Sequence, residues 1–220
     1  PVMRSPLRHV VLLLTVGLVS SSWAAPIVVE TPALTPEQQK AKFKLPPGFE
    51  IQLVAAEPDI GKPMNLNFDA RGRLWITHSL EYPFPTEGEG VQPRDLNQDM
   101  TTSHAPRDHY SYFESIGPEG LGQRLTHFAE GLNIPIGQMP IVWNHEQTSA
   151  LNYSIPSLKL YQRRSSSGLA ESATVLFTGF GFDDTHGNTN SFTLMPDGWV
   201  YACHGFRNAS KVTGKDGHTV

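Results

Sequence analysis

The chain of 220 residues contains a single cysteine, Cys203. One thiol cannot build an internal disulfide framework, and the sequence has no Cys-x-x-Cys-His segment for covalent haem attachment. It also lacks a phosphate loop, a dinucleotide-binding fingerprint and a Gly-x-Ser-x-Gly nucleophile elbow. Basic residues are not in excess either, because 17 Lys and Arg stand against 21 Asp and Glu, for a formal net charge of -4. This balance argues against a nucleic-acid-binding surface.

What the sequence does contain is enough apolar surface for a packed core, since 39% of its residues are hydrophobic and 10% are aromatic. Its 18 prolines and 19 glycines are scattered between short apolar runs. This punctuation is typical of many short strands and turns, not of long helices. We interpret Cys203 as a buried thiol within one such strand.

The N-terminus has the composition of a targeting segment. Arg4 and Arg8 precede an apolar run at residues 10–19, and small residues at 20–24 resemble a cleavage site. The run is about half as long as a bilayer-spanning helix. We therefore predict a signal peptide at residues 1–24 and an exported protein, periplasmic, extracellular or membrane-associated. A retained membrane anchor is the alternative.

Residues 25–47 are predicted to be a proline-containing linker with a short helical turn at residues 35–42, where Thr35 caps and Pro36 takes the first helical position. Residues 48–220 are then predicted to form one β domain. Its first strand is expected at residues 50–55, where apolar and polar side chains begin to alternate.

Two hairpin patterns recur within this domain. Residues 64–77 and 192–202 each read strand, acid-containing turn ending in glycine, and aromatic-bearing strand. A second pattern, a hairpin whose second strand ends in Phe followed by Gly two or three residues later, occurs at residues 109–131 and 157–179. Interleaved, they give quartets of strands every 55–70 residues, with a degraded repeat at residues 134–155.

A repeat of four antiparallel strands predicts an all-β fold, namely a β-propeller with four-stranded antiparallel blades. A β-sandwich built from the same hairpins is the alternative. The sequence accounts for about three blades, fewer than a closed propeller needs. We therefore expect residues 48–220 to be the N-terminal part of a propeller in a longer protein. Residues 83–107 would interrupt the first blade as a long loop, of the kind that is often functional or mobile.

The chemistry is concentrated in the polar stretch at residues 183–190, Asp-Asp-Thr-His-Gly-Asn-Thr-Asn, which leads into the last hairpin. His186 is the candidate general base, because an imidazole suits proton abstraction near neutral pH. Asp183 and Asp184 could orient its ring. The residues that we predict to bind substrate or cofactor are Asp184, Asn188, Asn190 and His204. A loop histidine held by hydrogen bonds is the alternative for His186, and a strand-end histidine that caps a carbonyl is the alternative for His204.

No complete metal site can be assigned from the sequence. Asp183 and Asp184 could serve a hard cation such as calcium, but no Asp-x-Asp-x-Asp-Gly loop is present. Strand alternation should place Cys203 and His204 on opposite faces, which argues against a Cys-His metal pair. We interpret His104 and His109, near Asp108, as solvated loop residues.

Six segments, in the same order, resemble the PVC-type membrane-bound dehydrogenases, large secreted bacterial proteins whose N-terminal domain is similar to the soluble quinoprotein glucose/sorbosone dehydrogenase propeller. The resemblance covers about residues 45–220. Its segments are residues 45–58, 68–75, 80–85, 128–135, 184–187 and 197–206.

The resemblance implies a six-bladed propeller that holds pyrroloquinoline quinone and calcium over its central channel. His186 occupies the place of the loop histidine that takes the proton of a sugar or alcohol hydroxyl. A cytochrome c domain would accept the electrons, with its c-type haem in a downstream domain absent from this chain. The turns at residues 117–122 and 165–168 depart from the family, since relatives often have Asp-rich, calcium-type turns there. A calcium-dependent propeller hydrolase or lactonase and a non-catalytic polysaccharide-binding propeller are the alternatives.

Overall fold

The computed structural model describes residues 32–86, 104–142, 147–165 and 168–220. The predicted signal peptide, most of the long loop at 83–107 and the turn of the degraded repeat lie outside these residues. The chain divides into two units, Pro1–Thr35 and Pro36–Val220, and the second contains all strands of the described residues. Among the described residues, no helix is long and apolar enough to cross a membrane.

The second unit begins with the short helix α1 (Pro36–Lys40), which confirms the helical turn expected there. Residues 50–55 form no strand, so that prediction is wrong. Val54 and Ala55 instead pack from an irregular segment against a cluster that contains Leu74, Ile76 and Phe113. This segment packs side chains onto a sheet face without forming a strand of its own.

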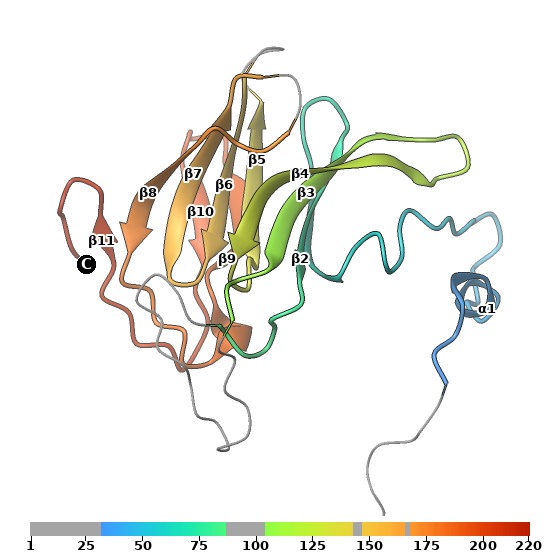
Figure 1. The fold of residues 1–220 in the computed structure, drawn as a ribbon, viewed down its shortest axis with the longest axis horizontal. Coiled ribbons are helices and arrows are strands. Elements are labelled where there is room, and N and C mark those ends of the chain that lie inside the picture. Colours follow the sequence, from blue (N-terminus) through green and yellow to red (C-terminus); the bar gives the residue numbers. More distant parts are fainter. Residues whose placement is uncertain (1–31, 87–103, 143–146, 166–167) are drawn as a thin grey trace, which may run out of the picture. The chain divides into compact units, whose positions relative to one another are not determined.

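The first sheet is an antiparallel meander in the order β1-β2-β3-β4 (Figure 1). Its strands are β1 (Lys62–Phe68), β2 (Leu74–Ser79), β3 (Asp108–Ile116) and β4 (Gly122–Leu132). The second sheet repeats this meander in the order β5-β6-β7-β8, and β11 pairs with the far edge of β8. Its strands are β5 (Gly137–Val142), β6 (Thr148–Ser154), β7 (Ser157–Arg163), β8 (Ser172–Thr178) and β11 (Thr213–Gly214). The all-β, antiparallel prediction is confirmed.

A third, two-stranded sheet pairs β9 (Asn190–Leu194) with β10 (Val200–Cys203) around the predicted Pro-Asp-Gly turn. β5 contacts both β1 and β9, so the first strands of three successive groups are neighbours. All four residues of β10 are exposed, including Cys203. The prediction of a buried thiol is therefore wrong, because no described element covers this strand.

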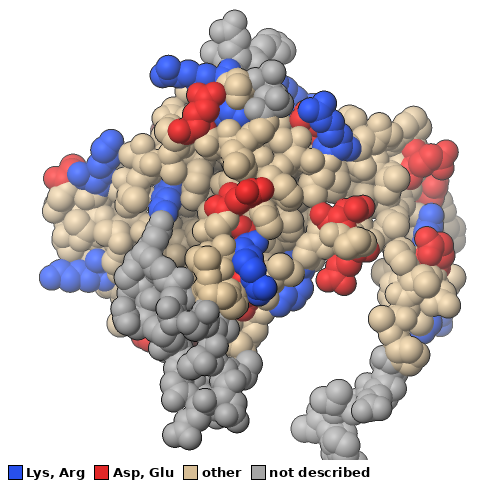
Figure 2. All heavy atoms as spheres, viewed as in Figure 1, with Lys and Arg blue, Asp and Glu red and all other residues tan. Residues whose placement is uncertain are grey.

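The main core lies between the first two sheets. Trp75 packs against Tyr110, Tyr112 and Phe128, with ring centroids 4.7–5.0 Å apart. Ala150 and Tyr161 of the second sheet join this cluster. These aromatic side chains are fully buried in the first sheet and supply much of the apolar area that stabilises the packing. On the face drawn in Figure 2, acidic and basic side chains are interspersed without a patch of one sign.

Candidate functional site

The predicted base lies in the 3₁₀ turn η1 (Thr185–Gly187), directly before β9. Asp184 caps this turn, since its Oδ1 accepts hydrogen bonds from the His186 backbone N (3.1 Å) and from the His186 Nδ1 (2.9 Å). A carboxylate can only accept, so Nδ1 carries the proton of the neutral ring and Nε2 keeps a free lone pair. The His186 side chain is 66% exposed, which leaves this lone pair open to a ligand.

The segment after β10 holds this turn in place. Asn208 exchanges two hydrogen bonds with the Asp184 backbone, at 2.8 and 2.9 Å. The Gly205 N donates to the Gly187 O (2.8 Å), and a Cβ at Gly205 would lie 2.4 Å from the Gly187 Cα. This close approach requires glycine at 205. The two open ends of the β9–β10 hairpin are therefore fastened to each other.

A cleft of about 470 Å³ opens beside η1. One wall contains Asp183, His186 and Arg207, and the other is the apolar segment Pro83-Phe84-Pro85. The volume falls within the range of about 300–1,000 Å³ that small-molecule sites occupy. The two walls are joined directly, because Thr185 Oγ1 donates to the Pro83 O at 2.8 Å. The rings of Tyr82 and His186 also meet in a T-shaped contact, with centroids 5.4 Å apart.

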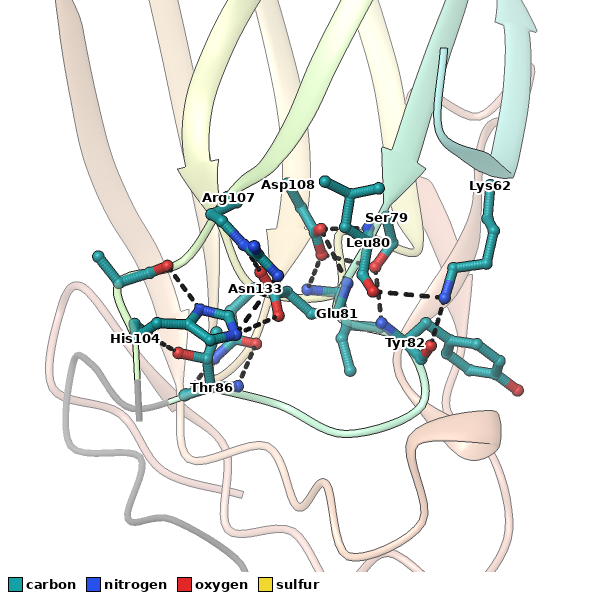
Figure 3. A network of polar contacts seen from close by, with 12 residues as sticks. Lys62, Ser79, Leu80, Glu81, Tyr82, Thr86, His104, Arg107, Asp108 and Asn133 are labelled. Carbon is teal, nitrogen blue, oxygen red and sulfur yellow. Dashed lines mark hydrogen bonds and ion pairs between the residues drawn. The ribbon is translucent and has the colours of Figure 1, made fainter. Parts of the chain in front are cut away.

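The apolar wall is built on a buried carboxylate (Figure 3). Asp108 is fully buried and accepts four hydrogen bonds, from Ser79 Oγ (2.6 Å) and from the backbone N of Leu80 (2.6 Å), Glu81 (3.2 Å) and Ile134 (2.9 Å). Burial raises the pKa of Asp108, although all four donors act in the opposite direction. His109 lies half-buried in β3, so its interpretation as a solvated loop residue is wrong, whereas His104 does lie outside the strands.

Further bonds fix both ends of the segment at residues 80–86. Asn133 accepts from the Thr86 N at 3.1 Å and donates to the Thr86 O at 2.8 Å. Lys62 Nζ donates to the carbonyls of Leu80 (3.3 Å) and Tyr82 (2.6 Å). The buried Glu81 accepts from Arg107 Nε at 3.1 Å, and His104 lies 3.3 Å from its other oxygen. The wall of the cleft is thus held in place before any ligand arrives.

The other predicted binding residues lie outside the cleft lining. His204 bonds Thr189 Oγ1 through Nδ1 (2.8 Å) and Ser210 Oγ through Nε2 (2.7 Å), so both ring nitrogens are engaged within the chain. Asn190 Nδ2 donates to the Asn188 O at 2.7 Å. Asn188 is fully buried, and its side-chain amide has no hydrogen-bond partner among the described residues. Their role in binding a ligand stays a prediction.

Arg207 is the site residue that the sequence did not single out. It lines the cleft and has a positive φ of 66°, an uncommon backbone conformation for a residue with a side chain. Hydrogen bonds from the side chain and then the backbone of His186 lower the pKa of Asp184, and the charge of Arg207 adds to this effect. Arg207 directly follows the family-like segment at residues 197–206, and no polar pattern in that segment indicated a role for it.

The cleft lining offers few side-chain ligands for calcium. The lining supplies Asp183 and Asp184, whereas calcium takes about six to eight oxygen ligands in proteins. The described part of the chain holds one group of three side chains suited to a metal, at His109, His127 and Glu130, and it is rich in nitrogen. The described residues therefore do not fit calcium, and its binding stays a prediction.

A family model described as a domain of unknown function (DUF7133) matches residues 35–219. The chain belongs to the DUF7133 family. The match spans the short helix, all three sheets and the cleft of His186. Searches of curated proteins and of solved structures give no match.

Proposed function

We propose that the sheets of this DUF7133 chain are blades of a β-propeller, six-bladed by the resemblance. Two consecutive four-stranded meanders have the strand order of propeller blades. The contacts of β5 with β1 and β9 agree with first strands that surround a common axis. A sandwich has two sheets, whereas β9 begins a third group beside β5, which favours the propeller over that alternative.

We propose that the chain belongs to an exported quinoprotein-type dehydrogenase that oxidises a hydroxyl of a sugar or alcohol. The observation that carries this proposal is the state of His186. Its ring is exposed beside a cleft, is oriented through Nδ1 by Asp184, and has Nε2 available as a base. An exposed histidine with this tautomer is the arrangement that abstraction of a hydroxyl proton requires.

In the reaction, the substrate hydroxyl would donate its hydrogen bond to His186 Nε2, which takes the proton as the carbonyl forms. The Asp184 carboxylate then stabilises the imidazolium through Nδ1, as an orienting acid does in other histidine-dependent sites. When bound, pyrroloquinoline quinone supplies the acceptor for the two electrons that leave with the carbinol hydrogen. The Pro83-Phe84-Pro85 wall would exclude water from one side of the substrate.

Arg207 is the cleft residue that would hold the quinone, because its guanidinium matches the carboxylates of this cofactor. The cleft volume suits a small molecule, and Arg207 is the cation of a lining that also contains the carboxylates of Asp183 and Asp184. Calcium does not fit the described lining, and no step proposed here depends on it. The electron acceptor downstream would be a protein such as a cytochrome c domain.

The experiment is cofactor binding and dye reduction by the full-length protein. Calorimetry with pyrroloquinoline quinone, with and without calcium, should show saturable binding, and a sugar and alcohol panel should reveal a substrate that reduces the dye. Arg207→Gln should weaken quinone binding at least tenfold, whereas Lys211→Gln, an exposed cation outside the lining, should not. Absence of both binding and reduction would contradict the proposal, and sugar binding without reduction would favour the polysaccharide-binding alternative.

A further inference from the structure

Three imidazoles and a carboxylate share one face of the first sheet. His78 at the end of β2 pairs across the ladder with His109 of β3, and Ser111 pairs with His127 of β4. The His78 and His109 rings stack at 5.2 Å, and the His109 and His127 rings at 4.5 Å. His109 Nε2 lies 4.0 Å from Glu130 Oε1. None of these residues lines the cleft of His186.

Irregular pairing in β4 explains how Glu130 reaches this face. Residues three apart on a regular strand, such as His127 and Glu130, point to opposite sides. The β3–β4 ladder shifts register on both sides of the Tyr110–Ala129 pair, with one more residue in β4 each time. Such bulges re-aim side chains and are frequent beside functional sites. Here the bulges bring the donor atoms of His109, His127 and Glu130 within 4.8 Å of one another.

A chain of hydrogen bonds sets the orientation of His127. The Gly61 N–H donates to His78 Nδ1 (3.1 Å), so the proton of the neutral ring is on Nε2, which faces Ser111 Oγ (3.0 Å). Ser111 Oγ lies 2.8 Å from His127 Nδ1, and with a metal on Nε2 the Nδ1 would keep its proton and donate it to Ser111 Oγ. His127 then presents the lone pair of Nε2.

We propose that His109, His127 and Glu130 form a binding site for a divalent transition metal, with zinc as the best fit. Two imidazoles and one carboxylate are a ligand set that zinc accepts, with a fourth position left for water. Hydrogen bonding of a ligating histidine through its other nitrogen is the usual support for such a site, and Ser111 supplies it here. This proposal does not depend on the proposed dehydrogenase function.

The distances require a small closure. Ligand atoms of a tetrahedral zinc lie about 3.4 Å apart, given zinc–ligand bonds of about 2.1 Å. Glu130 is the ligand able to move, since its side chain is 45% exposed, whereas the rings of His109 and His127 stack on each other. The site opens to a cavity of about 390 Å³ that both histidines line with Glu57 and Asp59. Two further acids nearby favour a cation over an anion at this position.

The test is a calorimetric titration of the chelator-treated full chain with zinc chloride at pH 7.5. One zinc per chain is expected, with affinity reduced at least 100-fold in His127→Ala and in His109→Ala, and about tenfold in Ser111→Ala. His104→Ala is the matched control, because His104 also faces a carboxylate, at 3.3 Å from Glu81, and lies outside the cluster. Its affinity should equal that of the unmodified chain.

Glu130→Gln is a variant that should not disturb the folded core, because the Glu130 side chain is half exposed. Zinc affinity should fall at least tenfold while the circular dichroism spectrum stays the same. If a histidine variant fails to fold, this variant decides alone. Absence of zinc binding, or equal affinity in Glu130→Gln and the unmodified chain, would overturn the proposal.

Discussion

The hairpins β1–β2 and β9–β10 have the same turn chemistry in very different surroundings. In the first, the Asp69 N donates to the Arg73 O and the Gly72 N donates to the Asp69 O. In the second, Met195, Trp199 and Gly198 repeat the same two bonds. Both turn glycines, at φ 76° and 84°, have the positive φ that the reversal needs.

Each turn also has an acid bonded to an aromatic side chain on the returning strand. Trp75 Nε1 donates to Asp69 at 2.8 Å, and Tyr201 Oη donates to Asp197 at 2.8 Å. Asp69 is buried by the aromatic core of the first sheet, together with Arg73, whereas Asp197 is exposed. Similar local sequence therefore produces a buried structural hairpin in one place and, in the other, an exposed hairpin that follows the turn of His186.

The largest expected effect is on the buried acid. Asp69→Ala should lower the free energy of unfolding by about 3–5 kcal/mol, because it leaves the buried Arg73 guanidinium, 2.6 Å away, without its counter-charge. Urea unfolding followed by tryptophan fluorescence measures this change. Asp197→Ala is the matched control and should leave the unfolding midpoint unaltered. Equal losses in both variants would contradict the contrast between the hairpins.

The next effect concerns the carboxylate beneath the apolar wall. Asp108→Asn should lower the free energy of unfolding by about 2–3 kcal/mol. An amide cannot accept all four hydrogen bonds, so buried donors are left unpaired. Thermal unfolding checks this prediction. Asp216→Asn, at an exposed turn, is the control. If Asp108→Asn kept full stability, the wall would not depend on this carboxylate.

Most of the ladder could be predicted because its signals are local. The acid-containing turns ending in Gly72 and Gly198, and the turns of the hairpins at residues 109–131 and 157–179, lie within a few residues of the strands that they connect. The cleft could not be predicted from the sequence, because the hydrogen bonds that build it join segments that are distant in the chain. Asp108 reaches Leu80 and Ile134 across 28 and 26 residues, and Asp184 meets Asn208 across 24.

A smaller effect is expected at the bond between the two walls. Thr185→Val removes the hydrogen bond to the Pro83 O and should lower the free energy of unfolding by about 1 kcal/mol. The Michaelis constant for a substrate should rise, because η1 loses its link to the apolar wall. Thr185→Ser keeps the hydroxyl and should behave like the unmodified protein. A valine variant identical to the serine variant would show that this bond has no role.

The smallest effect is a titration shift. Nuclear magnetic resonance should find the pKa of Asp184 below its ordinary value of 3.8, chiefly because of hydrogen bonds from His186. His186→Ala should raise it toward that value, while the lowered pKa of Asp197 should not change. Because the pKa of Asp184 is lowered in the folded state, its ionised carboxylate stabilises the fold at pH values above its ordinary pKa. This stabilisation is lost as the pH falls through the folded-state pKa. An unchanged Asp184 pKa in the variant would contradict the pairing.

The most direct test of the account compares two histidine variants of the full-length protein in quinone-dependent dye reduction. His218 is the matched control, because its backbone N bonds Asp216 Oδ1 (3.0 Å) just as the His186 N bonds Asp184, and it lies outside the cleft lining. We predict that His186→Ala loses at least 100-fold in kcat with quinone affinity unchanged, as expected for removal of a general base, and that His218→Ala keeps full activity. Equal activity in the two variants would contradict the assignment of His186 as the base.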